Sequence, residues 1–280
     1  RIALSQIAAQ FYGDPSKSLQ VFGVTGTNGK TSITHILHHI MQDSGIDCGT
    51  MGTLGFKTPS GMVSTGFTTP ESVEVHQMLK TLKMADVNNV IMEISSHALD
   101  LHRVENVDID IAIFSNLTPE HLDFHGDMES YFNSKVKLFT NLEKSKTAII
   151  NIDDSYSERF CKASNCNVIT YGMNPKADIH TTKFQSSING IKATVKYKNQ
   201  ILEINTKLIG EYNMYNILAA CTASLSVGIN SENIEHALLT LPPIPGRLEQ
   251  ITSNCPGSIF IDYAHTPDAY EKLFSTINNL

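Results

Sequence analysis

Lys30 and Thr31 end a glycine-containing stretch that runs from Val21 to Ser32, VFGVTGTNGKTS. A lysine ammonium binds phosphate oxygens, a threonine hydroxyl binds Mg²⁺, and Gly26 and Gly29 let the backbone approach a ligand closely. Apolar residues predict a strand before the stretch and a helix after it, so its amides would lie at a helix N-terminus. The stretch therefore predicts a polyphosphate-binding loop, although an apolar residue replaces the first glycine of the usual P-loop pattern. The alternative is a glycine-rich turn that Lys and Thr follow by chance.

Polar side chains also follow the predicted strand Val90–Ile94. Glu93 lies at its carboxyl end, where doubly wound sheets bind ligands and where a carboxylate can meet the metal ion of a nucleotide. The next residues, Ser95 to Arg103, supply hydroxyls, imidazoles and a guanidinium, which suit a polar or anionic substrate. If Glu93 acts alone, the alternative is a carboxylate that caps a neighbouring helix.

Two histidines follow the predicted strand Ile109–Phe114. His121 and His125 can each bind a metal ion through a neutral imidazole. The alternative is a pair of ordinary surface histidines. His121 is the stronger candidate because its loop leaves the same edge of the sheet as Glu93.

Lys135 is unusual because it lies on the apolar face of a predicted helix. At 100° per residue, Tyr131, Phe132, Val136, Leu138 and Phe139 share that face with it, whereas Lys137 points the opposite way. An amine in apolar surroundings has a lowered pKa and is nucleophilic at neutral pH, so it can take up CO₂ and become a carbamate. The alternative is a lysine whose stem packs and whose head reaches water.

Short β-branched runs alternate with helical patterns through the first part of the chain. The predicted strands are Val21–Val24, Val90–Ile94, Ile109–Phe114, Ala148–Asn151 and Val168–Tyr171, and the predicted helices include Val73–Met84 and Met128–Leu142. This alternation favours an α/β fold with a mostly parallel sheet flanked by helices. From 177 to 209 the period becomes two, and the turn signals Asn189-Gly190 and Lys198-Asn199 predict an attached antiparallel hairpin or meander.

The last third of the chain returns to helical patterns and then breaks. Helices are predicted at Asn213–Val227 and at Ser231–Leu239, the second with Ser231 as its N-cap. The proline-rich stretch Leu241 to Gly246 is the best linker. A strand at Ser258–Ala264 and a helix from about Pro267 follow, and so short a piece cannot bury a core of its own.

Bulk properties describe an ordinary globular chain of 280 residues with a net charge of −7. That charge argues against a nucleic-acid-binding surface, and no apolar run reaches the ~18 residues of a membrane-spanning helix. Five cysteines, at 48, 161, 166, 221 and 255, form no CxxC pair and give no disulfide framework, which favours a reducing compartment. Because the chain starts at Arg1 without a signal-peptide pattern, we expect a piece of a longer, cytoplasmic protein.

Seven motifs, in order along the chain, resemble those of the Mur ligases. They are TGTNGKT at 25–31, MEISSHALDLHRV at 92–104, NLTPEHLDFHG at 116–126, YFNSKVKLF at 131–139, GEYNMYNILAA at 210–220, PGRLE at 245–249 and DYAHTPDA at 262–269. The second and the last are most similar to those of the tripeptide-synthetase branch of the family. The resemblance implies an N-terminal domain tail and linker in 1–20, the central ATP-binding domain in 21–246, and the start of a truncated C-terminal α/β domain in 247–280.

The resemblance also implies an activity, ATP-dependent ligation in peptidoglycan biosynthesis. In that family ATP phosphorylates the terminal carboxylate of UDP-N-acetylmuramoyl-L-alanyl-D-glutamate, and the amine of a free third amino acid attacks the acyl phosphate. Meso-diaminopimelate and L-lysine both remain possible as that amino acid. We expect a monomer, and we expect residues 1–280 alone not to complete the ligation.

Motif by motif, the resemblance assigns roles to particular residues. ATP would contact Gly26, Thr27, Asn28, Gly29, Lys30, Thr31 and Ser32, with Asn213 and Asn216 near the adenosine and Arg247 and Asp262 as interdomain contacts. Of two Mg²⁺ ions, one would be held by Thr31 and Glu93 and the other by His121 and carbamylated Lys135. Lys30, Glu93, His121 and Lys135 would be catalytic, and Thr68, Thr69, Ser95 and Arg103 would bind the muramoyl dipeptide.

Three other functions are compatible with parts of this pattern. A folylpolyglutamate-synthetase-like ligase shares the ATP site, but Thr31 and Ser32 stand where such enzymes more often have Gly-Ser. A P-loop protein that uses ATP as a switch needs no second metal site, so Glu93, His121 and Lys135 together argue against it. The third is a non-catalytic fragment that keeps the site but lacks its partners.

Overall fold

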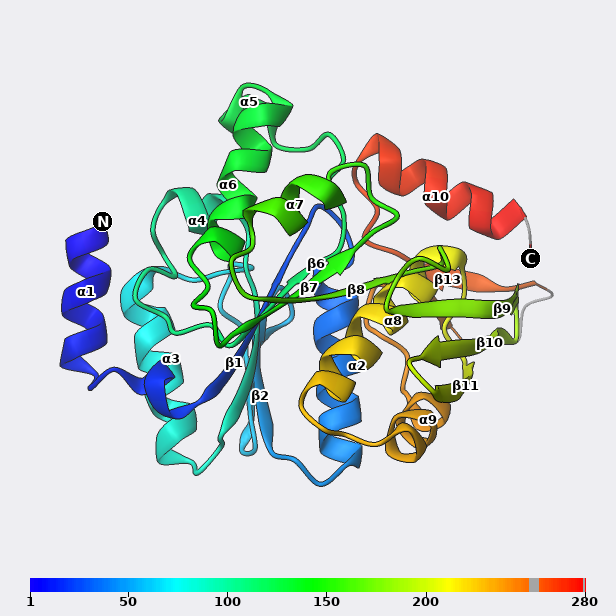
Figure 1. Cartoon of the computed structure of the whole chain (residues 1–280), viewed down its shortest axis with the longest axis horizontal. Coiled ribbons are helices and arrows are strands. Elements are labelled where there is room, and N and C mark those ends of the chain that lie inside the picture. The colour runs from blue at the N-terminus through cyan, green and yellow to red at the C-terminus, as the bar shows by residue number, and fades with distance from the viewer. Residues whose placement is uncertain (252–256, 279) are drawn as a thin grey trace.

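A single large sheet organises the molecule, which the computed structural model describes over residues 1–251, 257–278 and 280 (Figure 1). Its eleven strands lie in the order β11-β10-β9-β8-β7-β6-β1-β5-β2-β3-β4. Their bounds are β1 Gln20–Thr25, β2 Cys48–Gly52, β3 Gly55–Thr58, β4 Gly61–Val63, β5 Asn89–Glu93, β6 Ile111–Phe114, β7 Thr147–Asn151, β8 Asn167–Gly172, β9 Ile179–Ser187, β10 Gly190–Tyr197 and β11 Gln200–Thr206.

The middle of the sheet is parallel and its two edges are antiparallel. Strands β2, β5, β1, β6, β7, β8 and β9 run in one direction, whereas β3–β4 and β10–β11 add antiparallel pairs at the edges. This confirms the predicted α/β class and the antiparallel meander on the parallel sheet. The meander turns where predicted, with Gly190 (φ 120°) and Lys198 (φ 53°) in conformations that a tight hairpin requires. The strands β2 to β4 were not predicted.

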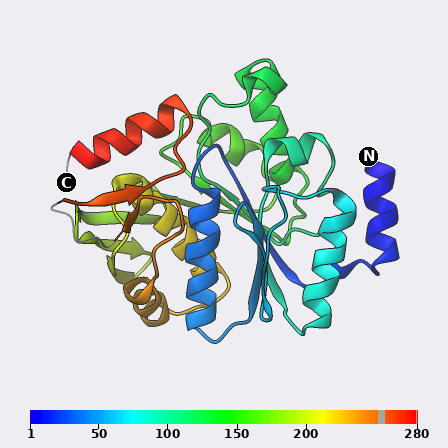
Figure 2. The same ribbon diagram turned by 180° about the vertical axis from the view of Figure 1, so that it is seen from behind.

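Helices cover both faces of the sheet (Figures 1 and 2). Their bounds are α1 Ile2–Phe11, α2 Lys30–Asp43, α3 Ser72–Met84, α4 Ser96–Asp100, α5 Leu122–His125, α6 Met128–Thr140, α7 Ser157–Ala163, α8 Glu211–Ser226, α9 Ser231–Thr240 and α10 Pro267–Asn278, with a 3₁₀ turn at Pro15–Ser18. One apolar core joins α2, α8 and α9 to one face, and a second joins α3, α6 and α7 to the other. The fold is therefore a three-layer sandwich.

One predicted helix cap is wrong. The N-cap of α9 is Asn230, whose side chain accepts a hydrogen bond from the amide of Asn233 at 2.8 Å, and Ser231 is already the first helical residue. An asparagine caps a helix at least as well as a serine, and at this position it reaches the free amide of the first turn.

The C-terminal segment differs from its prediction as well. The strand is shorter, β13 Ile259–Ile261, and it pairs with β12 Glu249–Ile251 in a separate two-stranded sheet. Cys255 lies outside the described residues. None of the described helices combines the length and apolar character needed to cross a membrane.

Parallel strands bring the predicted site together. β1, β5, β6 and β7 end at Thr25, Glu93, Phe114 and Asn151, so the loops that follow them leave the same edge of the sheet. In doubly wound sheets this carboxyl edge is the ligand-binding edge. The C-terminal segment returns to the same edge and forms the far wall of a cleft.

Candidate active site

The loop between β1 and α2 is shaped by two glycines. Gly26 (φ 148°) and Gly29 (φ 91°) have backbone conformations that L side chains rarely adopt. A Cβ at Gly26 would collide with Ser115 Oγ, and one at Gly29 would collide with Asn216 Oδ1. The loop thus packs tightly against its neighbours and leaves its amides at the start of α2, an arrangement that favours an anion.

Lys30 begins α2 and folds back over this loop. Its Nζ donates to the carbonyls of Gly26 and Thr27, both at 2.8 Å. Burial lowers the pKa of Lys30, and the carboxylates of Glu120 and Glu93 partly offset this effect. A half-buried ammonium that donates to two carbonyls can exchange them for phosphate oxygens when a polyphosphate binds.

Glu93 lies at the floor of the cleft beside Thr31. Its side chain accepts hydrogen bonds from Thr31 Oγ1, Thr53 Oγ1 and the Thr53 amide, each at 3.0 Å. Only 2% of the residue is exposed, and burial raises its pKa. A Cβ at Gly52 would collide with this carboxylate. Because a hydroxyl and a carboxylate are oxygen donors that Mg²⁺ prefers, and a cation would stabilise the buried anion, Thr31 and Glu93 fit a Mg²⁺ ion.

Lys135 lies beneath the loop rather than in water. It is 1% exposed, its Nζ donates to the Gly26 carbonyl at 3.0 Å, and it lies 4.6 Å from the centre of the Tyr131 ring. Burial, and then the charge of Lys30, lower its pKa well below the usual range. The alternative of a lysine that reaches solvent is therefore wrong, whereas Lys137 does face outward and pairs with Asp100 at 2.5 Å.

The two predicted histidines occupy different environments. His121 is partly exposed at the N-terminus of α5, and its Nε2 lies 3.7 Å from Glu120 Oε2. His125 is enclosed, with Nε2 at 2.9 Å from Ser96 Oγ and Nδ1 at 3.3 Å from Asp100 Oδ2. Both nitrogens of His125 are engaged, which leaves His121 as the histidine that can bind a ligand. Burial lowers the pKa of both rings, so they are neutral near pH 7.

The metal ligands expected from the sequence lie in two groups. Glu93 contacts Thr31, and His121 lies beside Glu120. Over residues 1–251, 257–278 and 280, no three His, Cys, Asp or Glu side chains converge on a point that would hold a metal ion. A metal ion here needs other ligands as well, and a hydroxyl, a carbamate and the phosphates of a nucleotide can supply them.

The predicted dipeptide-binding residues form a cluster of their own. Thr69 Oγ1 donates to the Glu93 carbonyl at 2.9 Å and lies 3.5 Å from Ser95 Oγ. The Arg103 guanidinium donates to the Thr69 carbonyl at 3.1 Å and pairs with Glu71 at 2.7 Å. Thr68 links this cluster to the cleft, because its hydroxyl lies 3.1 Å from Thr53 Oγ1.

The predicted adenosine and interdomain residues close the cleft from the other side. Asn216 Nδ2 donates to Asn213 Oδ1 at 3.1 Å, and Asn213 is itself anchored to the Ile209 carbonyl at 2.8 Å. Arg247 Nη2 donates to Thr31 Oγ1 at 3.0 Å. Asp262 accepts from the amides of Leu248 and Ala264, so it fixes the turn that carries Arg247.

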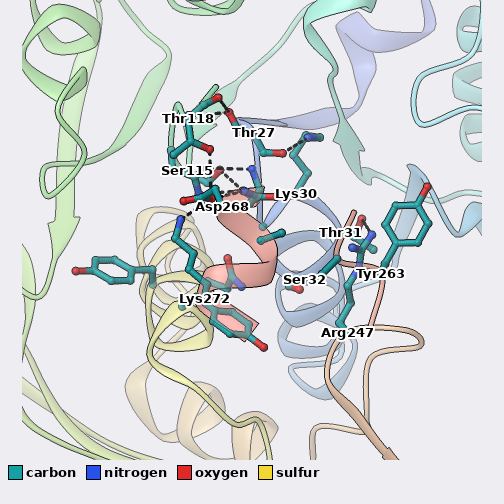
Figure 3. A pocket seen from close by; sticks show the side chains of 18 of the residues that line it. Thr27, Lys30, Thr31, Ser32, Ser115, Thr118, Arg247, Tyr263, Asp268 and Lys272 are labelled. Carbon is teal, nitrogen blue, oxygen red and sulfur yellow. Dashed lines mark hydrogen bonds and ion pairs between the residues drawn. The ribbon is translucent and has the colours of Figure 1, made fainter. Parts of the chain in front are cut away.

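Together these groups surround a cleft of about 770 Å³ (Figure 3). Its lining includes most of the predicted site residues: Thr27, Asn28, Gly29, Lys30, Thr31, Ser32, Thr68, Glu93, His121, Asn216, Arg247 and Asp262. Lys135, Asn213 and Gly26 lie directly behind this lining, and Thr69, Ser95 and Arg103 lie in the neighbouring cluster. The size and the convergent polar groups suit a nucleotide with a polyphosphate.

A family model described as the Mur ligase middle domain matches residues 24–224, more than two thirds of the chain. The chain belongs to the Mur ligase family.

Individual relatives match nearly the whole of this chain and share its fold. The chain is 39% identical over 283 residues to the UDP-N-acetylmuramoyl-L-alanyl-D-glutamate–2,6-diaminopimelate ligase of Halalkalibacterium halodurans, with all of this chain and 58% of the relative covered. A solved structure of a ligase with the same name superposes with a TM-score of 0.83 at 28% identity, over 98% of this chain and 56% of that one. The folylpolyglutamate synthase of Mycobacterium tuberculosis, complexed with ADP and AMPPCP, shares the fold with a TM-score of 0.84 at 16% identity, over 99% of this chain and 70% of that one. The chain thus spans a little over half the length of the curated relatives that it matches.

Several residues of the cleft were not singled out from the sequence. Glu120 is 10% exposed, and its charge acts on Lys30, His121 and Lys135. Thr53 holds the Glu93 carboxylate, and Asp268 and Lys272 line the far wall. Glu120 and Asp268 do lie inside two of the seven motifs, but a carboxylate in a loop gives no signal of its own without the fold.

Proposed function

We propose that this Mur ligase chain is the nucleotide-binding part of an ATP-dependent ligase that adds 2,6-diaminopimelate to UDP-N-acetylmuramoyl-L-alanyl-D-glutamate. One observation supports it above the others: the phosphate loop, buried Glu93 and buried Lys135 converge at one edge of the sheet. The choice of amino acid is supported by the name of the 39% identical relative, since the sequence alone left L-lysine equally possible. A cytoplasmic location, where ATP and the uridine nucleotide are available, belongs to the same proposal.

Two anions must meet in this reaction, and the chain provides the charges that permit it. A carboxylate oxygen of the dipeptide attacks the γ-phosphorus, ADP leaves, and an acyl phosphate results. The amine of the third amino acid then attacks the carbonyl carbon, inorganic phosphate leaves, and the nitrogen loses a proton. Lys30 and the loop amides hold the β- and γ-phosphates and stabilise their charge.

Two metal positions are part of the proposal. Thr31 and Glu93 would hold one Mg²⁺ ion, and His121 and carbamylated Lys135 would hold the other. Mg²⁺ supplies positive charge that offsets the repulsion between the carboxylate and the phosphates. Glu120, near both lysines, adds the negative charge that keeps this part of the cleft from becoming too positive.

Lys135 fits a carbamate for two reasons that the structure provides. Burial beside Lys30 favours its neutral amine, which is the form that attacks CO₂. The product is an anion beside the Lys30 ammonium, and the reaction releases one proton. In ¹³C-bicarbonate at pH 8, we expect one carbamate resonance in the wild-type chain and none in Lys135→Arg. A wild-type spectrum without that resonance, at saturating Mg²⁺ and ATP, would contradict the assignment.

Substrate positions follow from the two neighbouring clusters. The muramoyl dipeptide would contact Thr68, Thr69, Ser95 and Arg103, where Arg103 offers a guanidinium to an anionic group. The adenosine would lie by Asn213 and Asn216, with Arg247 and Asp262 contacting the nucleotide from the C-terminal segment. These assignments place the γ-phosphate between the two clusters.

Phosphate release tests the function in a form of the protein extended to the length of its relatives. We expect release from ATP only when both UDP-N-acetylmuramoyl-L-alanyl-D-glutamate and diaminopimelate are present, with L-lysine much less effective. A folate-type ligase would instead require a folyl substrate and glutamate. An ATP switch would hydrolyse ATP in the absence of diaminopimelate and of L-lysine.

For residues 1–280 alone, we expect ATP binding but no tripeptide. Ligation requires both substrates within near-attack distance of the acyl phosphate, and this chain spans only part of its relatives. Tripeptide formed by the purified chain, above a control without enzyme, would overturn this expectation.

A further inference from the structure

One carboxylate oxygen joins the C-terminal segment to two loops of the cleft. Asp268 lies in the first turn of α10, and its Oδ2 accepts hydrogen bonds from Asn28 Nδ2 at 3.0 Å and from Thr118 Oγ1 at 3.3 Å. The same oxygen accepts from Lys272 Nζ, one turn later, at 2.8 Å. Figure 3 shows Asp268 between Thr118, Ser115 and Lys272. Residues 240 positions apart in the chain thus meet at one atom.

Asn28 is held so that only its side-chain amide remains to face Asp268. The backbone amide of Asn28 donates to Asn116 Oδ1 at 2.9 Å. The backbone carbonyl of Asn28 accepts from Ser115 Oγ at 2.6 Å and from Asn116 Nδ2 at 3.1 Å. These contacts fix the backbone of the phosphate loop against the loop that follows β6. Any shift of the phosphate loop therefore moves the group that Asp268 binds.

Thr118 gives Asp268 a contact with the second loop. Its amide donates to Thr27 Oγ1 at 3.0 Å, and its carbonyl accepts from the same hydroxyl at 3.1 Å. Thr118 precedes His121 by three residues, so the contact lies in the loop that carries a proposed metal ligand. Asp268 thus contacts both loops that would surround the phosphates.

Charge compensation makes such a carboxylate tolerable beside a phosphate site. The Lys272 ammonium neutralises Asp268 across one turn of α10, and an acidic residue in a first turn also interacts favourably with the helix dipole. An unpaired carboxylate here would repel a polyphosphate. The Asp268–Lys272 pair therefore presents an acceptor to the loops with little net charge.

α10 has few other means of attachment among the described residues. None of its residues is buried, although Thr276 packs closely enough against Gly210 that a Cβ there would be 2.9 Å from Thr276 Cγ2. The polar junction at Asp268 is thus a large part of what holds this helix across the cleft.

We propose that Asp268 is a positioning residue that docks the C-terminal segment on the phosphate loop through Asn28 and Thr118, with Lys272 compensating its charge. Closure of the cleft then requires the phosphate loop to be in its binding conformation. The catalytic consequence rests on the function proposed above, whereas the docking itself does not.

Hydrogen exchange of the 280-residue chain without nucleotide tests the docking. Asp268→Ala should speed exchange of the α10 amides about tenfold, the loss expected for hydrogen bonds to a charged group, and leave α2 unchanged. Glu271→Ala is the matched control, since Glu271 lines the same cleft from the same helix and makes no hydrogen bond or ion pair among the described residues. Equal rates in wild type and Asp268→Ala, or an equal effect of Glu271→Ala, would overturn the proposal.

A residue swap separates docking from general support of the fold. Asn28→Asp alone opposes two carboxylates and should speed α10 exchange, whereas Asn28→Asp with Asp268→Asn restores an amide–carboxylate hydrogen bond and should recover most of the protection. Asn28→Ala and Asp268→Ala should be non-additive. Additive effects, or a swap no better than Asn28→Asp, would contradict the contact. Because no nucleotide is present, failure of the proposed ligase activity would leave this result unaffected.

Discussion

The wall of the cleft at the sheet edge and the C-terminal wall, formed by residues 246–251 and 257–278, are held together differently. At the sheet edge, Glu93 and Lys135 are buried ionisable groups whose partners are fixed hydroxyls, amides and carbonyls. In the C-terminal wall, Tyr263 is 56% exposed, and among the described residues α10 is attached by polar contacts and surface packing. The first wall is preorganised by its burial, whereas the second is attached by a few bonds that water can replace. The two walls should therefore respond differently to substitution, the sheet edge more strongly than the C-terminal wall.

The largest expected effect is the difference in local stability between the two walls. Helices in the core open only with the whole domain, whereas a surface helix opens by itself at a much lower free energy. We expect amides of α10 to exchange on the order of 10³ times faster than those in the middle of α2. Similar protection in the two helices would show that the walls form one cooperative unit.

Glu93→Gln should lower turnover by on the order of 10², because it weakens the hold on the proposed Mg²⁺ ion, whose positive charge would stabilise the transferring phosphoryl group. Phosphate release by the protein extended to the length of its relatives would measure it, with Glu271→Gln as a control carboxylate in the opposite wall. In residues 1–280, calorimetry should also show that Mg²⁺ no longer strengthens ATP binding. Turnover similar to wild type would remove Glu93 from the proposed metal site.

Arg247→Ala should have a smaller effect, about a tenfold rise in the Kd for ATP, because its guanidinium reaches Thr31 from the more weakly held wall. It also stacks 4.8 Å from the centre of the exposed Tyr263 ring. Arg159→Ala, which breaks an ion pair with Glu129 away from the cleft, is the control and should leave the Kd unchanged. If Arg247→Ala weakened ATP binding by as large a factor as Glu93→Gln lowers turnover, residues of both walls would contribute equally to the reaction.

The smallest expected effect concerns stability. Burial raises the pKa of Glu93, so the folded chain binds more protons than the unfolded chain between the unfolded and folded pKa values. Stability therefore falls as the pH rises through that window, and the loss persists at pH 7. Glu93→Gln should raise the Tm at pH 7 by about 2–4 °C, the shift that ~1 kcal/mol gives in a domain of this size, and should raise it less at pH 4. A lower Tm at pH 7 would show that the hydrogen bonds of Glu93 outweigh its burial.

Local patterns in the sequence were sufficient to predict much of the wall at the sheet edge. The sequence TGTNGKT predicted a tight loop at a helix start, and the structure has it, with Gly26 and Gly29 in conformations suited to glycine. Helical spacing placed Lys135 on the apolar face of its helix but left open whether its ammonium would be buried or reach water, and in the structure it is buried. Both signals arise within one turn or one helix, so no distant contact is needed to read them.

The strands β2 to β4 were missed for a physical reason. Their glycines argue against a strand, because glycine has a low β propensity. In the fold, Gly49 and Gly52 are required, since a Cβ would collide with Leu82 at the first and with Glu93 at the second. Whether a glycine is needed at these two positions depends on neighbours that are more than thirty residues away in the sequence.

By itself, then, the sequence determined the α/β class, the phosphate loop and the place of Lys135 on the apolar face of a helix, because each follows from periodicity or from the conformational freedom of a glycine. The tertiary structure alone decided that Glu120 lies beside both lysines and that Asp268 binds Asn28. A carboxylate can lie anywhere on a protein surface, and its role depends on which charges and hydrogen-bond donors the fold brings near it. Those neighbours come from loops on separate strands and from a segment at the opposite end of the chain.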